Sequence, residues 1–413
     1  MEALTDAMIA GALEFKKNKI WDTLKGDNLI ALTFIDGTVG YIHVFCPKGD
    51  GYGSLGIRGF ALYRADELYG YRFMVHRPIG MSEVEAQVQW SLRSCIELHF
   101  APKDRASPAF VEAIRLYRAE MGLRSTGKNA FFEIVRYLPH LTPQFLTDPK
   151  DRTHTEEALN FLNWLSRHGG GERLPAFDDG IPCFTACTGT YRMAKVELPP
   201  IKEYEFPKVP FPNEVLAHRL KSAGKRGILD CNLVTLPTMV MDEEDEIPCY
   251  PWVLLACPED EEYTMEPYIY RRFDEKIVEA LAETFVRLGF VPWEIHVINE
   301  RTGNLLEDFC RKTGIHLAMG KSWKVIEDMS NEFFYYMDPA NLDYEEDSDF
   351  SGEEDDAQDP DLLEIIHKLT LMSDDMIQSM PDFIQQAVRI RSDELPKSLR
   401  KRLSRLWGWK RQS

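Results

Sequence analysis

The sequence predicts an α+β protein, with an N-terminal α+β domain followed by an α/β domain. A tight-turn signal, Asp36-Gly37, stands between strand-like residues 28–34 and 39–45, which is typical of an antiparallel β-hairpin. Between residues 267 and 336, strand-like and helix-like segments alternate three times, which is typical of parallel strands joined by right-handed crossovers. A chain of 413 residues is also too long for one ordinary core, so at least two domains are expected.

The N-terminal α+β domain is predicted to cover residues 1–170. Hydrophobic periodicity and turn residues indicate helices at 5–20, 82–92, 108–121 and 153–167, and strands at 28–34, 39–45, 54–63 and 95–100. Three glycines, Gly169 to Gly171, end the last helix and mark the first boundary. Residues 51–56 match G-x-G-x-x-G, but a strand-like segment follows where a dinucleotide site needs a helix, so a glycine-rich turn is expected.

The rest of the chain divides by composition. Residues 171–212 are predicted to be a connector, because five prolines fall between Leu198 and Pro212. A second α/β domain is expected at 213–338 and includes a short parallel βαβαβα segment. Its expected strands are 227–236, 251–257, 267–271, 293–298 and 315–319, and its expected helices are 273–288, 304–312 and 321–336. An acidic linker, 339–361, and a helical tail, 362–413, complete the organisation.

Charge is strongly segregated along this chain of net charge −19. Residues 343–361 hold eleven acids and no base, whereas residues 389–411 hold nine bases against two acids. An acidic body argues against nucleic-acid binding by the body. The basic tail, 396–413, has an apolar stripe that includes Leu399 and Trp407, so we expect it to dock on the protein's own acidic surface. RNA or anionic lipid is the alternative target of this tail.

The composition indicates a soluble, cytoplasmic protein. No run of eighteen apolar residues predicts a membrane span, and the first residues lack the pattern of a signal peptide. The eight cysteines are scattered, mostly in apolar surroundings, which is typical of reduced thiols. Only Cys183 and Cys187 lie close together, and no second Cys or His pair at zinc-finger spacing accompanies them. No metal and no cofactor are therefore expected.

A set of short segments spread over both predicted domains has a familiar pattern. The segments are Trp21, 27–30, Gly40-Tyr41, 55–63, 94–103, 122–123, 127–128, 138–143, Tyr250-Pro251 and 267–317. In these segments the sequence resembles an uncharacterised bacterial family of proteins built from two domains of unknown function. The resemblance covers most of residues 15–335 and implies two globular domains in this order, but it supplies no catalytic residue. Family members are expected to have Pro-Gly where this chain has Pro139-His140.

Polar residues follow the predicted strands of the second domain. Because ligands bind beyond the carboxyl ends of parallel strands, these residues form the candidate site if the strands are neighbours. Glu300 is the weak catalytic candidate, and the binding candidates are Arg272, Asn299, Arg301, Thr302 and Lys321. The alternative is that residues 299–302 only cap a helix and that the arginines form surface ion pairs. His296, inside a strand with Glu294 and Ile298 on the same side, is interpreted as a structural histidine.

The function is not fixed by any motif. No Gly-x-Ser-x-Gly, Walker A or His-Glu-x-x-His pattern occurs. We therefore expect a non-catalytic interaction or regulatory protein, with an unidentified protein partner. The alternative is a hydrolase or nuclease-type enzyme that uses Glu300 at the strand ends.

Overall fold

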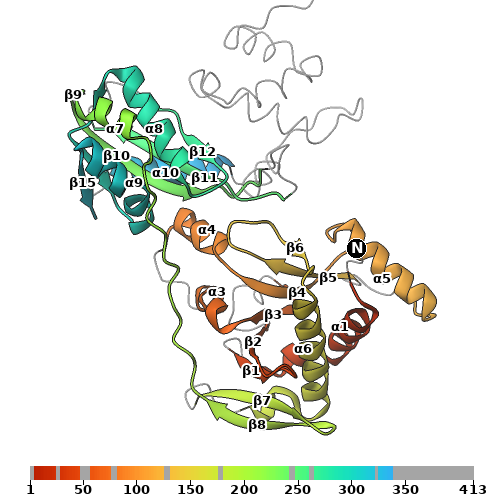
Figure 1. The fold of residues 1–413 in the computed structure, drawn as a ribbon. Coiled ribbons are helices and arrows are strands. Elements are labelled where there is room, and N and C mark those ends of the chain that lie inside the picture. The colour runs from red at the N-terminus through yellow and green to blue at the C-terminus, as the bar shows by residue number, and fades with distance from the viewer. Residues whose placement is uncertain are drawn as a thin grey trace, which may run out of the picture.

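An eight-stranded β-sheet organises the first half of the described chain and a five-stranded sheet the second (Figure 1). Residues Gly224–Lys225 and Phe290–Val291 pair in a separate two-stranded sheet. The structure is a computed structural model and describes residues 4–24, 28–46, 56–75, 81–124, 131–174, 180–240, 247–259, 265–320 and 324–337. The predicted α+β class is confirmed. The expected acidic linker, the helical tail, Lys321 and residues 51–55 of the glycine-rich motif lie outside the described residues.

The first sheet has eight strands in the order β6-β5-β4-β3-β2-β1-β7-β8. All neighbouring strands are antiparallel except β1 and β7, which are parallel. The strands are β1 (Ile30–Thr33), β2 (Val39–Val44), β3 (Gly59–Tyr63), β4 (Cys95–Ala101), β5 (Phe131–Tyr137), β6 (Gln144–Phe145), β7 (Ile181–Cys187) and β8 (Thr190–Val196). The predicted hairpin is confirmed: β1 and β2 pair across Asp36-Gly37, and Gly37 has a φ of +82°.

Helices cover both faces of this sheet (Figure 1). One face buries the main apolar core against α1, α5 and α6, and the other packs against α3. The first half contains α1 (Asp6–Asn18), η1 (Ile20–Asp22), η2 (Ala65–Glu67), α3 (Leu68–Val75), α4 (Glu83–Ser91), α5 (Pro108–Glu120), α6 (Pro149–Arg167) and η3 (Gly170–Arg173). Helix α6 begins at Pro149, four residues before the expected start, because Asp148 caps it by accepting a hydrogen bond from Lys150 N.

The expected connector, 171–212, is a connector only in part. Strands β7 and β8 fall inside it and extend the first sheet, with β7 paired to β1. The turn between them contains Gly189 at a φ of +72°, a two-residue hairpin signal that the neighbouring prolines obscured. Further along, Phe211 is fully buried in the core of the second half, and Val209 N donates to Asn304 O at 3.0 Å.

The second sheet has five strands in the order β12-β11-β10-β14-β15. Strands β10, β14 and β15 are parallel, whereas β11 is antiparallel to both of its neighbours. The expected alternation of strands and helices is present, but β11 and β10 separate β12 from β14, so the crossover through α8 skips two strands. The elements are α7 (Glu214–Lys221), β9 (Gly224–Lys225), β10 (Ile228–Thr235), β11 (Trp252–Pro258), β12 (Tyr268–Tyr270), α8 (Glu275–Leu288), β13 (Phe290–Val291), β14 (Glu294–Val297), α9 (Glu300–Thr313), β15 (His316–Met319) and α10 (Lys324–Met337).

Helix α4 joins the two halves. Helices α7, α8 and α9 bury one face of the second sheet, and α10 lies on the other. Val84 of α4 packs in the same apolar cluster as Val234 of β10 and Ile326 of α10. The first half thus supplies a helix to the core of the second. No helix among the described residues is long and apolar enough to cross a membrane.

His140 lies at the seam between the halves. Its backbone N donates to Ser91 O at 2.6 Å, and its carbonyl accepts from Tyr250 N at 2.8 Å. The ring lies 4.3 Å from that of Trp252. The backbone φ is +63°, in the left-handed region that glycine adopts without cost and that other residues rarely adopt.

We expect His140 to make the protein sensitive to acid. Burial of the ring lowers the pKa of His140 to about 3, so the folded state keeps it neutral. Above pH 6.5, the pKa of histidine in the unfolded chain, the ring is neutral in both states and its burial costs no deprotonation. As the pH falls from 6.5 toward 3, the unfolded state binds a proton that the folded state does not, so the folded protein loses stability. Urea unfolding of the wild type and of His140→Gly at several pH values checks this. The difference in the free energy of unfolding between the two proteins should change by up to ~1.4 kcal/mol per pH unit below 6.5. A difference that stays constant with pH would contradict this role of His140.

Candidate functional site

Asn299 and Thr302 form the cap of α9. Asn299 Oδ1 accepts from Thr302 N at 2.9 Å and from Thr302 Oγ1 at 2.7 Å, and Asn299 Nδ2 donates to Asn232 Oδ1 at 2.8 Å. Thr302 Oγ1 in turn accepts from Leu233 N at 3.0 Å. These contacts hold α9 against β10, so the structure gives both residues a capping role.

Arg301 is buried at the start of α9, with 4% of the residue exposed. Its Nε donates to Leu233 O at 2.6 Å, and its Nη1 lies 2.7 Å from Glu85 Oε2 of α4. Burial lowers the pKa of Arg301, and the charge of Glu85 offsets part of that effect. Arg301 therefore joins the halves of the protein.

The remaining candidates of the second half are not brought together. Glu300 and Arg272 are both exposed, and two strands stand between the ends of β12 and β14 that carry them. The strand order thus corrects the expectation that these side chains converge, because the strands are not neighbours. The His296 ring lies between two carboxylates: Nε2 shares a hydrogen bond with Glu294 Oε1 at 2.9 Å, and Nδ1 lies 3.1 Å from Asp230 Oδ1.

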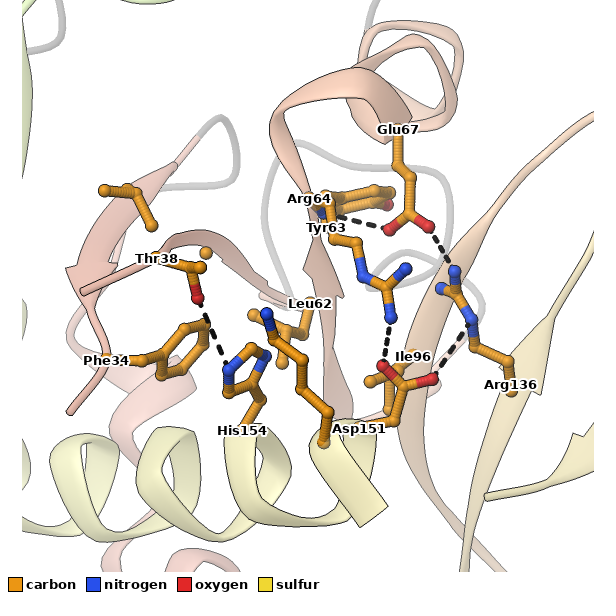
Figure 2. Close-up of a pocket in the computed structure, with 13 residues that line it drawn as sticks. Phe34, Thr38, Leu62, Tyr63, Arg64, Glu67, Ile96, Arg136, Asp151 and His154 are labelled. Atoms are coloured by element: carbon orange, nitrogen blue, oxygen red, sulfur yellow. Dashed lines mark hydrogen bonds and ion pairs between the residues drawn. The ribbon is translucent and has the colours of Figure 1, made fainter. Parts of the chain in front are cut away.

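A different site lies in the first half, between the start of α6 and the sheet. This cavity, which we call the α6 cavity, has a volume of about 180 Å³ (Figure 2). The start of α6 and the strands β2 to β5 surround it. Its lining consists of Phe34, Thr38, Val39, Gly40, Leu62, Tyr63, Arg64, Glu67, Ile96, Arg136, Lys150, Asp151 and His154.

Four charged groups form a ring at one end of the α6 cavity. Figure 2 shows the guanidinium groups of Arg64 and Arg136 on either side of the Asp151 carboxylate, with the Glu67 carboxylate opposite. Arg64 Nη2 donates to Asp151 Oδ1 at 2.5 Å, and Arg136 Nη2 donates to Glu67 Oε1. Arg136 Nε lies 3.6 Å from Asp151 Oδ2. The ring carries two positive and two negative charges.

A second polar group lies at the opposite end, around Asp36. His154 Nε2 lies 3.2 Å and Lys150 Nζ 3.1 Å from Asp36 Oδ2. The His154 ring stacks on Phe34 at a centroid distance of 3.9 Å. Hydrogen bonds from Thr38 Oγ1 and N to Asp36, with Lys150 and His154 adding to them, lower the pKa of Asp36. Asp36 is therefore an anion already supplied with donors.

The Glu67 carboxylate is stabilised as an anion by several partners. Burial would raise the pKa of Glu67, but the hydrogen bond and charge of Arg136, together with hydrogen bonds from Arg64 N and Ser94 Oγ, lower it. Glu67 accepts from Ser94 Oγ at 2.9 Å and from Arg64 N at 2.9 Å. Burial would lower the pKa of Arg64, yet its bond to Asp151 raises it. Glu67 and Arg64 are therefore charged.

One buried donor of the ring has no acceptor in the part of the chain that the structure describes. Only 9% of the Arg136 side chain is exposed, and its buried Nη1 makes no hydrogen bond to the residues that the structure describes. A buried N–H group without an acceptor costs about 1–3 kcal/mol, and more when the group is charged. Arg136 is one of the residues that line the α6 cavity.

The α6 cavity was not predicted from the sequence. Two local signals were available: Asp148-Pro149, a cap and first residue of a helix, and Gly40, a glycine inside a strand. A Cβ atom at residue 40 would come within 2.5 Å of the Phe34 ring and 2.9 Å of Leu62 Cδ1. Gly40 thus allows these side chains to line the cavity. No pattern linked these signals to Arg136.

One family model matches part of the chain. Residues 216–334, from α7 to α10, match a domain of unknown function (DUF6930). The match confirms a domain of unknown function in the second half, and it lies outside the α6 cavity. No curated protein and no solved structure matches the chain. Among the described residues, no group of three or more His, Cys, Asp or Glu side chains is arranged to hold a metal ion.

Proposed function

We propose that this protein binds a small anionic molecule in the α6 cavity and acts as a non-catalytic interaction or regulatory protein. The observation that carries the proposal is the buried Nη1 of Arg136, which faces no protein acceptor among the described residues. The neighbouring cations, Arg64 and Lys150, are about half exposed, with 46% and 49% of their side chains accessible. Each is paired with a carboxylate, Arg64 with Asp151 and Lys150 with Asp36, so they bring hydrogen-bond donors and no net charge to the two ends of the cavity.

An inventory of donors and acceptors favours an anion over a cation. The carboxylates Glu67, Asp151 and Asp36 already accept hydrogen bonds from the protein. A guanidinium has five N–H groups, and those of Arg136 Nη1 remain without a described acceptor. A ligand with acceptor oxygens would supply the partner that Arg136 Nη1 lacks among the described residues.

The enzyme alternative has no observation in its favour. Glu300 is exposed, and Arg272 lies beyond two intervening strands. In a regulatory role, ligand binding in the first half would change the contact between the two halves, or the contact between this protein and a protein partner. We place this role in the bacterial cytoplasm. The support is the resemblance of the sequence to a bacterial family, together with eight cysteines that all lie in the described residues without a disulfide.

The proposal is tested by thermal unfolding of the full chain in butyrate, phosphate or sulfate, against chloride at equal ionic strength. At least one of the three should raise the Tm, because a ligand that binds only the folded state stabilises it. Arg64→Gln should weaken binding of that anion by roughly tenfold or more, as a charge-assisted hydrogen bond contributes about 1.5–3 kcal/mol. Arg192→Gln, an exposed arginine on β8, is the matched control and should bind like the wild type. An equal effect of both substitutions would contradict the proposal.

A further inference from the structure

The α6 cavity has one polar and one apolar wall. Leu62, Ile96 and Arg136 pair in register across β3, β4 and β5, so they form one row on the same face of the sheet. Neighbouring strands lie about 4.8 Å apart. The row therefore places a charged head group at Arg136 and two buried apolar side chains, Leu62 at 4% and Ile96 at 3% exposure, within about 10 Å of it. The Phe34 ring continues the apolar wall (Figure 2).

Charge favours a monoanion. The ring of Arg64, Arg136, Glu67 and Asp151 is neutral, and the Lys150–Asp36 pair adds no net charge. A monoanion in this cavity leaves one uncompensated negative charge, whereas a phosphate or sulfate dianion leaves two. The free energy of hydration that an ion loses on burial grows steeply with its charge, so a dianion loses more of it than a monoanion on entering the cavity. The planar fork of a guanidinium also matches the two oxygens of a carboxylate.

Volume limits the size of the ligand. An apolar cavity of roughly 150 Å³ admits benzene, a molecule of six carbon atoms. The α6 cavity, at about 180 Å³, is slightly larger. It therefore suits a molecule of roughly six to eight non-hydrogen atoms, such as a carboxylate with a short alkyl chain.

We propose that the α6 cavity binds a short-chain monocarboxylate, with its carboxylate on Arg136 Nη1 and Arg64 and its alkyl chain against Leu62 and Ile96. This inference rests on the proposed function and specifies its ligand. Formate would engage only the charged end of the cavity, and butyrate would also cover the apolar row.

The test is a titration of the full chain with formate, acetate, propionate, butyrate and octanoate, and with phosphate and sulfate. Affinity should rise about fourfold for each added methylene, as expected for burial of a CH₂ group, and should stop rising once the cavity is full. Gly40→Ala, which pushes Phe34 and Leu62 into new positions, should lower the affinity for butyrate more than the affinity for formate. In the unmodified protein, the butyrate methyl protons should show nuclear Overhauser effects to the methyl groups of Leu62 and Ile96.

The outcomes separate this inference from the function on which it rests. Tighter binding of phosphate or sulfate than of butyrate, or an affinity that does not depend on chain length, would overturn the proposal that the ligand is a monocarboxylate. Either result would leave the proposal of anion binding intact. If none of these anions binds more tightly than chloride, the cavity holds water only, and both proposals fail.

Discussion

Replacing Arg136 by methionine is expected to lower the free energy of unfolding by about 3–5 kcal/mol. Glu67 and Asp151, 8% and 7% exposed in their side chains, would lose the partner that they share. Removing one partner of a buried ion pair leaves an uncompensated charge, which is why such substitutions are strongly destabilising. Urea unfolding of wild type and Arg136→Met measures the difference.

Arg64→Met is the matched control for this prediction. Arg64 contacts the same Asp151, but 46% of its side chain is exposed, and exposed pairs contribute only ~0.2–1 kcal/mol. Adding Glu67→Gln to Arg136→Met should restore part of the lost stability, because the buried charge is removed. Equal effects of Arg136→Met and Arg64→Met would mean that the ring is solvated, and the account of the α6 cavity would be wrong.

Replacing Arg301 by methionine is expected to lower the free energy of unfolding by about 2–4 kcal/mol. The substitution removes charged hydrogen bonds to Leu233 O and to Glu85, and it leaves both acceptors without this donor. Since Glu85 belongs to α4, the contact between the two halves should loosen as well. Hydrogen exchange of α4 and α9, followed together with urea unfolding, reports both effects.

Glu300→Ala, one residue away, is the control for Arg301. Glu300 is exposed in the first turn of α9, where an acid stabilises the helix by about 0.3–1 kcal/mol. Its loss should therefore change stability by no more than that amount. A larger loss of stability in Glu300→Ala than in Arg301→Met would contradict the capping and bridging roles assigned to these residues.

Local patterns predicted the local structure. Asp36-Gly37 specified the hairpin of β1 and β2, and α8 ends at Leu288, where the predicted helix 273–288 ends. These features depend on a few consecutive residues, so one sequence is sufficient to predict them. The predicted position of Glu294 and His296 on one side of β14 is likewise confirmed by their hydrogen bond.

Features that depend on contacts between distant residues were not predictable in this way. The strand order of the second sheet places β11 and β10 between β12 and β14, and no local pattern encodes that order. The α6 cavity combines η2, β5 and the first turn of α6, so that Glu67 meets Arg136 across 69 positions of sequence. Lone arginines and acids in a sequence resemble ordinary surface residues, and only folding shows that these are buried.

The most direct test of monocarboxylate binding is a structure of the full chain from crystals grown in butyrate. Density for butyrate is expected in the α6 cavity, with its carboxylate within hydrogen-bond distance of Arg136 Nη1 and its alkyl chain against Leu62 and Ile96. A cavity that contains only water at saturating butyrate, or an Arg136 Nη1 that donates to a protein carbonyl, would contradict it.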